Sequence, residues 1–297
     1  MTDPPVIGDV ALLVARRFRV PLVVVSEDVF PEIAVELQRL RSPLLVGLLG
    51  SLTRFYLRRA DRVVAIGETM ERRLATKGAA PERMRVIPNW TDTRSITPQP
   101  RDNSWAREHD LVGRFVVMHS GNVGHAQDLD TLIRAATFLR DLEDLRIVIV
   151  GFGARHAEHV ALAERLDTDL VRFLPYQPRE ALARSLSSAD VHFVGLGRGL
   201  SGYVVPSRLY GILAAGRPVV AAAEGDSETA RVIEEVGCGI VIAPGQPDVL
   251  ARSLRRLASG DVDLEEMGRR GREYVVAEAD RDVAVARYRD LLDEVRA

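Results

Sequence analysis

The chain has 297 residues, of which 46% are hydrophobic, and a formal net charge of -2 at pH 7. This length predicts about two domains with ample core, and the balanced charge excludes a strongly basic nucleic-acid-binding surface. Cys238 is the only cysteine, which excludes an intramolecular disulfide and favours a reducing, cytoplasmic compartment.

The first hundred residues predict three strands, since short apolar runs rich in β-branched residues occupy 22–25, 62–66 and 84–87. Residues 43–52 form an apolar stretch that continues into the arginine-containing segment 53–59. This segment is either a core helix with a solvated end or a helix lying on an anionic membrane surface, and the first is favoured. No apolar run reaches the roughly 18 residues of a spanning helix, and no stretch resembles a signal peptide.

Proline and polar residues at 97–104 mark the predicted boundary between the two halves. After it, five apolar runs at 115–118, 146–150, 191–194, 219–222 and 239–242 predict strands, separated by helical patterns such as 130–139 and 179–186. Because apolar and polar residues do not alternate along these runs, they indicate a parallel sheet covered by helices on both faces, as in a Rossmann-like domain. The fold class is therefore α/β and doubly wound, and the front half holds fewer strands than the back half.

Two helices are predicted to close the chain, at 264–276 and 281–296, with a change of direction at 277–280. The second carries one apolar stripe that should pack against another part of the molecule. The stripe consists of Val283, Val285, Tyr288, Leu291 and Leu292.

Two glycine turns follow successive strands of the back half. Gly121, Asn122 and Gly124 come after the strand at 115–118, and Gly151 and Gly153 come after the next one. One such turn is as readily structural as functional, but two at neighbouring strand ends favour a nucleotide-binding crevice, where backbone N–H groups approach an anion.

A third element begins with Pro206, Ser207 and Arg208 and continues through Leu209 towards a stop at Gly216. A proline, a hydroxyl and a guanidinium in the first turn of a helix suit a diphosphate, because free N–H groups, the helix dipole and the cation converge. The alternative is an ordinary capped helix in which Arg208 is solvated.

The six histidines form neither a metal site nor a catalytic triad pattern. His156 and His159 share a helix face, for which a solvated position is favoured over metal binding. His119 adjoins the first glycine turn, and either faces the cleft or ends its strand in a hydrogen bond. With no D-x-D motif in a suitable loop, we expect a metal-independent site.

These motifs, in this order, resemble the donor domain of retaining glycosyltransferases of family 4, in the bacterial branch that builds O-antigens, capsules and exopolysaccharides. The front half agrees through 27–32, 60–64 and 86–92, and the back half through 171–175, which includes Leu174, and 189–191. The resemblance implies a GT-B fold with two Rossmann-like domains. Residues 1–103 would be a partial acceptor-side domain, 104–280 the nucleotide-sugar domain, and 281–297 a helix crossing back.

The implied activity is transfer of a sugar from a nucleotide diphosphate donor, expected to be UDP-linked, with retention at the anomeric carbon. Acceptors would be glycans or polyprenyl-linked molecules, which suggests peripheral contact with the inner face of the plasma membrane. Arg208 is the expected catalytic residue, as it would stabilise the leaving phosphate. The donor-binding residues would be Gly121, Asn122, Gly124, Gly151, Gly153, Leu174, Pro206, Ser207, Arg208 and Leu209.

Three features depart from the family pattern. The resemblance starts mid-domain, so roughly 80–90 residues of the acceptor-side domain are missing from the match. The two glutamates of the E-x7-E motif fall on Tyr203 and Gly211, and the basic residues that contact the diphosphate fall on Asn122 and Gln127. A donor-binding subunit or truncated product, completed by another chain, is therefore the main alternative. A non-hydrolysing sugar-nucleotide epimerase is a weaker one.

Overall fold

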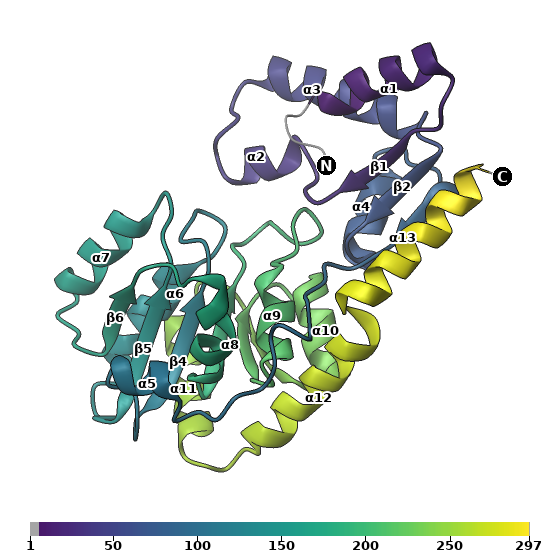
Figure 1. Ribbon diagram of the computed structural model, residues 1–297. Helices are drawn as coiled ribbons and strands as arrows, with labels where there is room; N and C mark the ends of the chain where they lie inside the picture. The colour runs from purple at the N-terminus through teal and green to yellow at the C-terminus, as the bar shows by residue number, and fades with distance from the viewer. Residues whose placement is uncertain (1–5, 297) are drawn as a thin grey trace.

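The structure is a computed structural model that describes residues 6–296. Its front part holds a parallel sheet in the order β1-β2-β3, formed by β1 (Val23–Ser26), β2 (Arg62–Ala65) and β3 (Met84–Val86) (Figure 1). These are the three strands predicted from the apolar runs. Within the described residues, β1 pairs only with β2, so its other side is a sheet edge.

The back part holds a six-stranded parallel sheet in the order β6-β5-β4-β7-β8-β9. The predicted count of five was wrong, because the edge strand β6 is half-buried and tolerates Arg172 among its apolar residues, so no continuous apolar run marks it. The α/β class and the smaller front sheet are confirmed. The strands are β4 (Phe115–Ser120), β5 (Leu145–Val150), β6 (Val171–Leu174), β7 (Val191–Gly195), β8 (Val219–Ala222) and β9 (Gly239–Ile242).

The strand order places the topological switch point between β4 and β7. From β4 the chain moves outward through β5 to β6, then returns to pair β7 with the other side of β4. In open parallel sheets the ligand crevice lies beyond the carboxyl ends of the strands at this point. The turn that follows β4 is therefore the place where this fold binds ligands.

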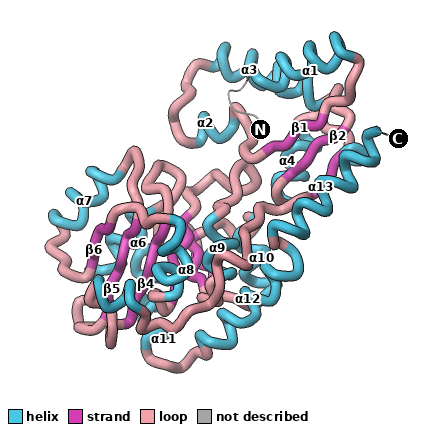
Figure 2. The backbone as a smooth tube through the Cα atoms, viewed as in Figure 1, coloured by secondary structure: helices cyan, strands magenta, loops and turns pink. Residues whose placement is uncertain are grey.

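Helices cover both faces of the large sheet (Figure 2). Neighbouring residues of β4 point to opposite faces of the sheet. Val117 packs with α6, α7 and α11 on one face, and Met118 packs with α5 on the other. The β7–β8 end of the second side packs against α9, α10 and α12. The helices of the back half are α5 (Ser104–Glu108), α6 (Leu129–Ala135), α7 (His156–Arg165), α8 (Leu182–Ser187), α9 (Arg208–Ala214), α10 (Glu228–Val236), α11 (Pro247–Ala258) and α12 (Leu264–Glu278).

The small sheet is covered on one face by α1 (Ile7–Phe18), α3 (Pro43–Leu57) and α4 (Glu68–Thr76). The short α2 (Glu32–Glu36) instead contributes Ile33 to the apolar cluster of the back half. The last helix, α13 (Arg281–Arg296), crosses back and covers the other face (Figure 1). This crossing was expected from the family resemblance. No helix within residues 6–296 is long and apolar enough to span a bilayer.

The predicted apolar stripe of α13 is only partly correct. Leu291 is buried and Tyr288 packs against the small sheet, but Val285 and Leu292 are exposed. Ala284 takes their place in the contact, because the buried side of the helix is centred on a small residue that lets the sheet approach closely.

The first half of α3 is apolar and exposed. Leu44 is 86% exposed, and Leu45 and Leu48 are exposed as well, while the buried residues of α3 all lie in its second half. The expectation that residues 43–52 form a core helix is therefore wrong.

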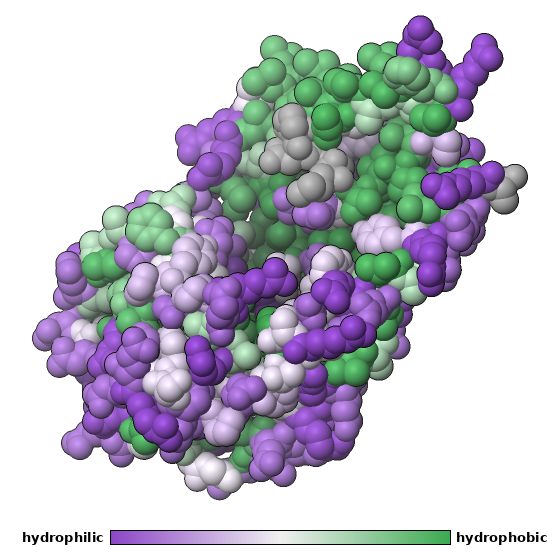
Figure 3. All heavy atoms as spheres, viewed as in Figure 1, coloured by the Kyte–Doolittle hydropathy of each residue, from purple (hydrophilic) through white to green (hydrophobic). Residues whose placement is uncertain are grey.

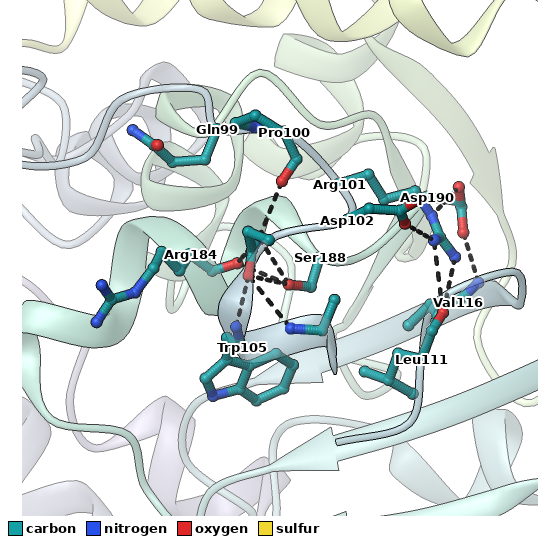
Figure 4. Close-up of polar contacts among 12 residues, drawn as sticks. Gln99, Pro100, Arg101, Asp102, Trp105, Leu111, Val116, Arg184, Ser188 and Asp190 are labelled. Atoms are coloured by element: carbon teal, nitrogen blue, oxygen red, sulfur yellow. Dashed lines mark hydrogen bonds and ion pairs between the residues drawn. The ribbon is translucent and has the colours of Figure 1, made fainter. Parts of the chain in front are cut away.

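The segment between the two halves is anchored to the large domain (Figure 4). Arg101 Nε donates to Asp190 Oδ1 at 2.7 Å, and the second oxygen of Asp190 accepts from Val116 N at 2.6 Å. Asn103 caps α5 by accepting from the N–H groups of Trp105 and Ala106. These contacts order the linker against the start of β4.

The halves also meet through a buried carboxylate. Glu228 of α10 is 4% exposed, and its Oε2 accepts from Thr69 N at 3.3 Å near the start of α4. Gly67 leaves room for it, because a Cβ there would lie 2.6 Å from the Glu228 side chain. At the junction predicted at 277–280, Asp280 accepts from Thr93 N at 3.0 Å where the chain crosses back.

Candidate functional site

The two predicted glycine turns lie against each other at the carboxyl ends of β4 and β5. Gly121 and Gly151 have φ values of +139° and +135°, a region that favours glycine. A Cβ on Gly151 would lie 2.0 Å from the Gly121 carbonyl oxygen, so the close approach also requires glycine. Gly153 packs against Asn122 in the same way, with its missing Cβ 2.5 Å from Asn122 Oδ1.

The backbone N–H groups of the first turn are not free, contrary to the expectation from the sequence. Gly121 N donates to Val150 O at 2.9 Å, and Val123 N donates to Phe152 O at 3.0 Å. These bonds tie one turn to the next strand and turn, which is why the glycines pack so closely. Gly124 N donates to Gln127 Oε1 at 2.9 Å, and since this acceptor is a side chain, an incoming anion is able to replace it.

Arg208 lies directly beside this turn. A Cβ on Gly121 would be 3.8 Å from Arg208 Cζ, and Arg208 Nη1 lies 2.9 Å from both ring nitrogens of His119. Within the described residues Arg208 forms no ion pair with a carboxylate, and it is half-buried. Burial lowers its pKa to about 10, so the guanidinium stays charged at neutral pH. The interpretation of Arg208 as a solvated helix residue is wrong.

His119, at the end of β4, is fully buried. Burial, with the nearby charge of Arg208, holds the pKa of its imidazole well below the ordinary value of 6.5, so the ring is neutral. A neutral ring has one donor and one acceptor nitrogen. We assign the proton to Nε2, which lies 3.3 Å from Asn122 O, and this leaves Nδ1 to accept from Arg208.

Of the two alternatives for His119, the hydrogen-bonded strand-end position is correct. The contact with Arg208 was missed, because the two residues are 89 positions apart and belong to different elements, β4 and α9. The only sequence feature that points to it is the position of His119 immediately before the glycine turn.

Of the remaining predicted donor-binding residues, Pro206, Ser207 and Leu174 lie at or next to the ends of elements, whereas Leu209 lies in the core. Pro206 and Ser207 immediately precede α9, and the Ser207 side chain is exposed. Leu174 ends β6, where its carbonyl accepts from Gly151 N at 2.9 Å. Leu209 is fully buried in the core and does not face the turn. The first turn of α9 also offers fewer N–H groups than expected, because Leu209 N and Tyr210 N donate to Pro206 O and Ser207 O.

A cavity of about 480 Å³ opens between the halves next to the first glycine turn. Arg208 is not among the described residues that line it, but it lies beside Gly121 at the start of the same turn. The front half contributes Asp28, Phe30, Ile33, Ala34, Leu37 and Arg39, and the back half contributes Asn122, Gly124, His125, Ala126, Gln127 and Ala154.

Among residues 6–296, no group of three or more histidine, cysteine or acidic side chains is arranged to hold a metal ion. The solvated position expected for His159 is wrong. It is fully buried, with Nε2 3.0 Å from Asp130 Oδ1.

Comparison with family models assigns both halves to glycosyl transferases. The model described as "Glycosyl transferases group 1" matches residues 102–274, more than half of the chain. The model described as "Glycosyl transferase 4-like domain" matches residues 2–90.

Among curated proteins, the chain is 30% identical over 254 residues to "Probable glycosyltransferase WbjE" of Pseudomonas aeruginosa, covering 83% of this chain and 61% of that protein. It is also 30% identical over 204 residues to "Putative colanic acid biosynthesis glycosyl transferase WcaI" of Escherichia coli K12, covering 67% of this chain and 50% of that protein. The matches therefore span less than two thirds of these relatives.

Solved structures share the fold at low sequence identity. HepE of Anabaena, in complex with UDP, aligns with a TM-score of 0.82 at 17% identity, covering 99% of this chain and 77% of HepE. Sucrose-phosphate synthase of Thermosynechococcus elongatus aligns with a TM-score of 0.80 at 19% identity, covering 97% and 71%. Both alignments include the two sheets, so the chain shares a two-domain GT-B arrangement.

Proposed function

The chain belongs to the group 1 glycosyl transferases, and from that premise we propose that it transfers a sugar from a nucleotide diphosphate donor to an acceptor. The observation that carries this proposal is Arg208. It is a half-buried cation without a carboxylate partner in the described chain, beside the glycine turns at the switch point of the sheet. An unpaired, partly desolvated cation in this position favours a ligand that brings negative charge.

The donor we propose is a UDP-sugar bound without a metal ion. HepE structures that share this fold are described as complexes with UDP and with UDP-glucose. The guanidinium presents a planar set of N–H donors that suits a diphosphate. Asn122, Gly124 and Gln127 border the adjoining cavity, and the Gln127 side chain would leave Gly124 N when a phosphate oxygen takes its place.

In the proposed reaction the bond between the anomeric carbon and the β-phosphate breaks, and negative charge develops on the phosphate. Arg208 stabilises this charge, with help from the Ser207 hydroxyl and the Gly124 N–H once it is released. Fixed charges of this kind, held before the reaction starts, lower the barrier by several kcal/mol in many enzymes. The acceptor hydroxyl attacks from the same face and passes its proton to the departing phosphate, so the configuration is retained and no protein nucleophile is needed.

We propose that the acceptor is a glycan or polyprenyl-linked molecule used in cell-surface polysaccharide synthesis at the inner face of the membrane. Support comes from the name of WcaI, which assigns that relative to colanic acid biosynthesis. The cavity between the halves is lined by front-half residues such as Phe30, Ile33 and Leu37, and an acceptor would enter from that side.

A second candidate is a donor-binding subunit that needs further polypeptide for activity. The specific observation in its favour is the edge of β1, a valine-rich strand that pairs only with β2 in the described chain. Edges of this kind pair readily with additional strands. The incomplete coverage of the relatives agrees with this candidate.

Calorimetry and a transfer assay test the two candidates. We expect UDP to bind in the presence of EDTA, and more tightly than GDP. Binding only with Mg²⁺ or Mn²⁺, or a preference for GDP, would contradict the proposed donor mode. Release of UDP from a UDP-sugar in the presence of lipid-linked acceptors supports the transferase, whereas UDP binding without transfer supports the donor-binding subunit.

A further inference from the structure

One short segment forms the front side of the cavity between the halves. All six of the described front-half residues that line the cavity fall within residues 28–39, which we name the front wall and which include α2. None of the five residues of α2 is buried, and a helix this short is not stable by itself. Figure 3 shows hydrophobic residues inside the hollow between the two halves. The position of the front wall therefore depends on the contacts that anchor it.

Lys77, which caps the C-terminus of α4, ties the front wall to the front half. Its Nζ donates to Phe30 O at 2.7 Å and to both carboxylate oxygens of Glu32, the first residue of α2. The lysine side chain is buried, at 7% exposed. Burial lowers the pKa of its ammonium, and the neighbouring Glu32 carboxylate opposes this change. The ammonium thus joins the residues on either side of Pro31, where α2 begins.

The geometry of this contact explains why a lysine occupies position 77. Of the 40 lysine and arginine residues in the chain, Lys77 is the only lysine. Three acceptor oxygens converge on its single nitrogen, which suits an ammonium with three donors at one point. The N–H groups of a guanidinium are spread over a plane and do not converge in this way. The contact therefore requires an ammonium and not merely a positive charge.

The front wall also contacts the back half. Val29 N donates to Tyr203 O at 2.8 Å, and Ile33 and Leu37 pack on the apolar cluster that contains α9. The first glycine turn lies across the cavity from the wall. A molecule in the cavity would therefore contact the wall on one side and the proposed donor site on the other. Lys77 is not among the described residues that line the cavity, so it acts on such a molecule only through the wall.

We propose that Lys77 is a positioning residue that holds the front wall in place for the acceptor. This inference rests on the proposed function, in which the acceptor enters from that side. When the tether is lost, the wall is ordered for only part of the time, and the apparent affinity for the acceptor falls by that fraction. Donor binding does not change, because Arg208 and the glycine turns belong to the back half. The chemical step also does not change once the acceptor is bound.

Hydrogen exchange, measured by mass spectrometry without donor or acceptor, tests the tether. In Lys77→Met the amides of α2 should exchange about tenfold faster, as for the loss of a hydrogen bond to a charged group. Lys77→Arg should restore only part of the protection, because its donors do not converge. Arg72→Met, the matched control at an exposed position of α4, should exchange like the wild type. Glu32→Gln weakens the same contact from the wall and should give a smaller increase, so the test holds even if Lys77→Met fails to fold.

Kinetics separate positioning from a general loss of stability. With UDP-glucose as donor and a polyprenyl diphosphate-linked N-acetylglucosamine as acceptor, Lys77→Met should raise the acceptor KM about three- to tenfold, with kcat and UDP affinity nearly unchanged. Unchanged exchange of α2 would overturn the proposal. So would an acceptor KM equal to that of the wild type, or a UDP affinity that falls as much as KM rises. A wild type that binds UDP but transfers no sugar would contradict the proposed function, and exchange alone then decides whether Lys77 orders the wall.

Discussion

Arg208 Nη1 lies 2.9 Å from His119 Nδ1, which links the start of α9 to the end of β4. The imidazole is fully buried, so its position is set by the sheet. This contact fixes one end of a guanidinium that forms no ion pair with a carboxylate in the described chain. We therefore treat His119 as a positioning residue that orients the cation towards the proposed diphosphate site.

Replacing His119 by leucine removes the acceptor, and we expect UDP affinity to fall about three- to tenfold, as for the loss of one hydrogen bond. His119→Asn, which keeps an acceptor oxygen near the place of Nδ1, should recover part of the loss. In an Arg208→Ala background His119→Leu should have no further effect on UDP affinity. Additive losses in that double variant would show that His119 does not act through Arg208.

Stability should fall as the pH is lowered from about 6.5 towards 4. Burial lowers the pKa of His192 to about 4 and that of His119 well below 6.5. Between those values the unfolded chain binds protons that the folded chain does not, so the free energy of unfolding decreases with falling pH. Chemical denaturation at a series of pH values measures the slope, and His192→Phe should reduce it. An unchanged slope in that variant would contradict the assignment.

Gly151→Ala and Gly211→Ala should act in opposite directions. A Cβ on Gly151 meets the Gly121 carbonyl at 2.0 Å, and its positive φ adds strain, so the variant should lose several degrees of melting temperature and weaken UDP binding. Gly211 lies inside α9, where a Cβ would find its nearest neighbours at 3.9 Å, so alanine should stabilise by about 0.5–1 kcal/mol. Thermal melts of both variants decide this, and a destabilised Gly211→Ala would be the contrary result.

Glu228→Ala should destabilise the protein by about 2–3 kcal/mol, because it leaves a buried part of Arg231 and Thr69 N without their acceptor. Glu235 binds the same Arg231 but is 60% exposed, so Glu235→Ala should cost no more than about 0.5 kcal/mol. Urea unfolding of the two variants compares them directly. A loss in Glu228→Ala no larger than the loss in Glu235→Ala would mean that the buried carboxylate contributes no more than an exposed ion pair.

The fold was predictable to the extent that apolar runs marked the strands. β1, β2, β4, β5, β8 and β9 contain uninterrupted apolar runs of three or more residues, whereas β6 is a partly buried edge strand whose run is interrupted by Arg172. The helix at 43–57 was found, but its exposure was not, since an apolar sequence does not show what covers it. The packing side of α13 was misjudged, because Ala284 is less conspicuous than Val285.

The candidate site was predictable in composition but not in its contacts. The glycine turns and Arg208 were identified from their positions after strands, and the structure brings them together. Periodicity does not show which N–H groups are already bonded, so the engagement of Gly121 N with Val150 O was missed. The pairing of His119 with Arg208 depends on strand order, which places β4 at the switch point, and no local pattern contains that information.

The most direct test of the central claim is the affinity of Arg208→Ala for UDP, measured by calorimetry in EDTA beside the wild type and Arg208→Lys. If the guanidinium binds the diphosphate, its loss removes charge-assisted hydrogen bonds worth about 1.5–3 kcal/mol, so affinity should fall on the order of 10- to 100-fold. Arg208→Lys should recover only part of this, because an ammonium lacks the planar arrangement of donors. Melting temperature should fall modestly in Arg208→Ala, because the buried Nδ1 of His119 loses its donor, so affinities are compared at a temperature where all three proteins are folded. Unchanged UDP affinity in Arg208→Ala, with the fold intact, would contradict the account.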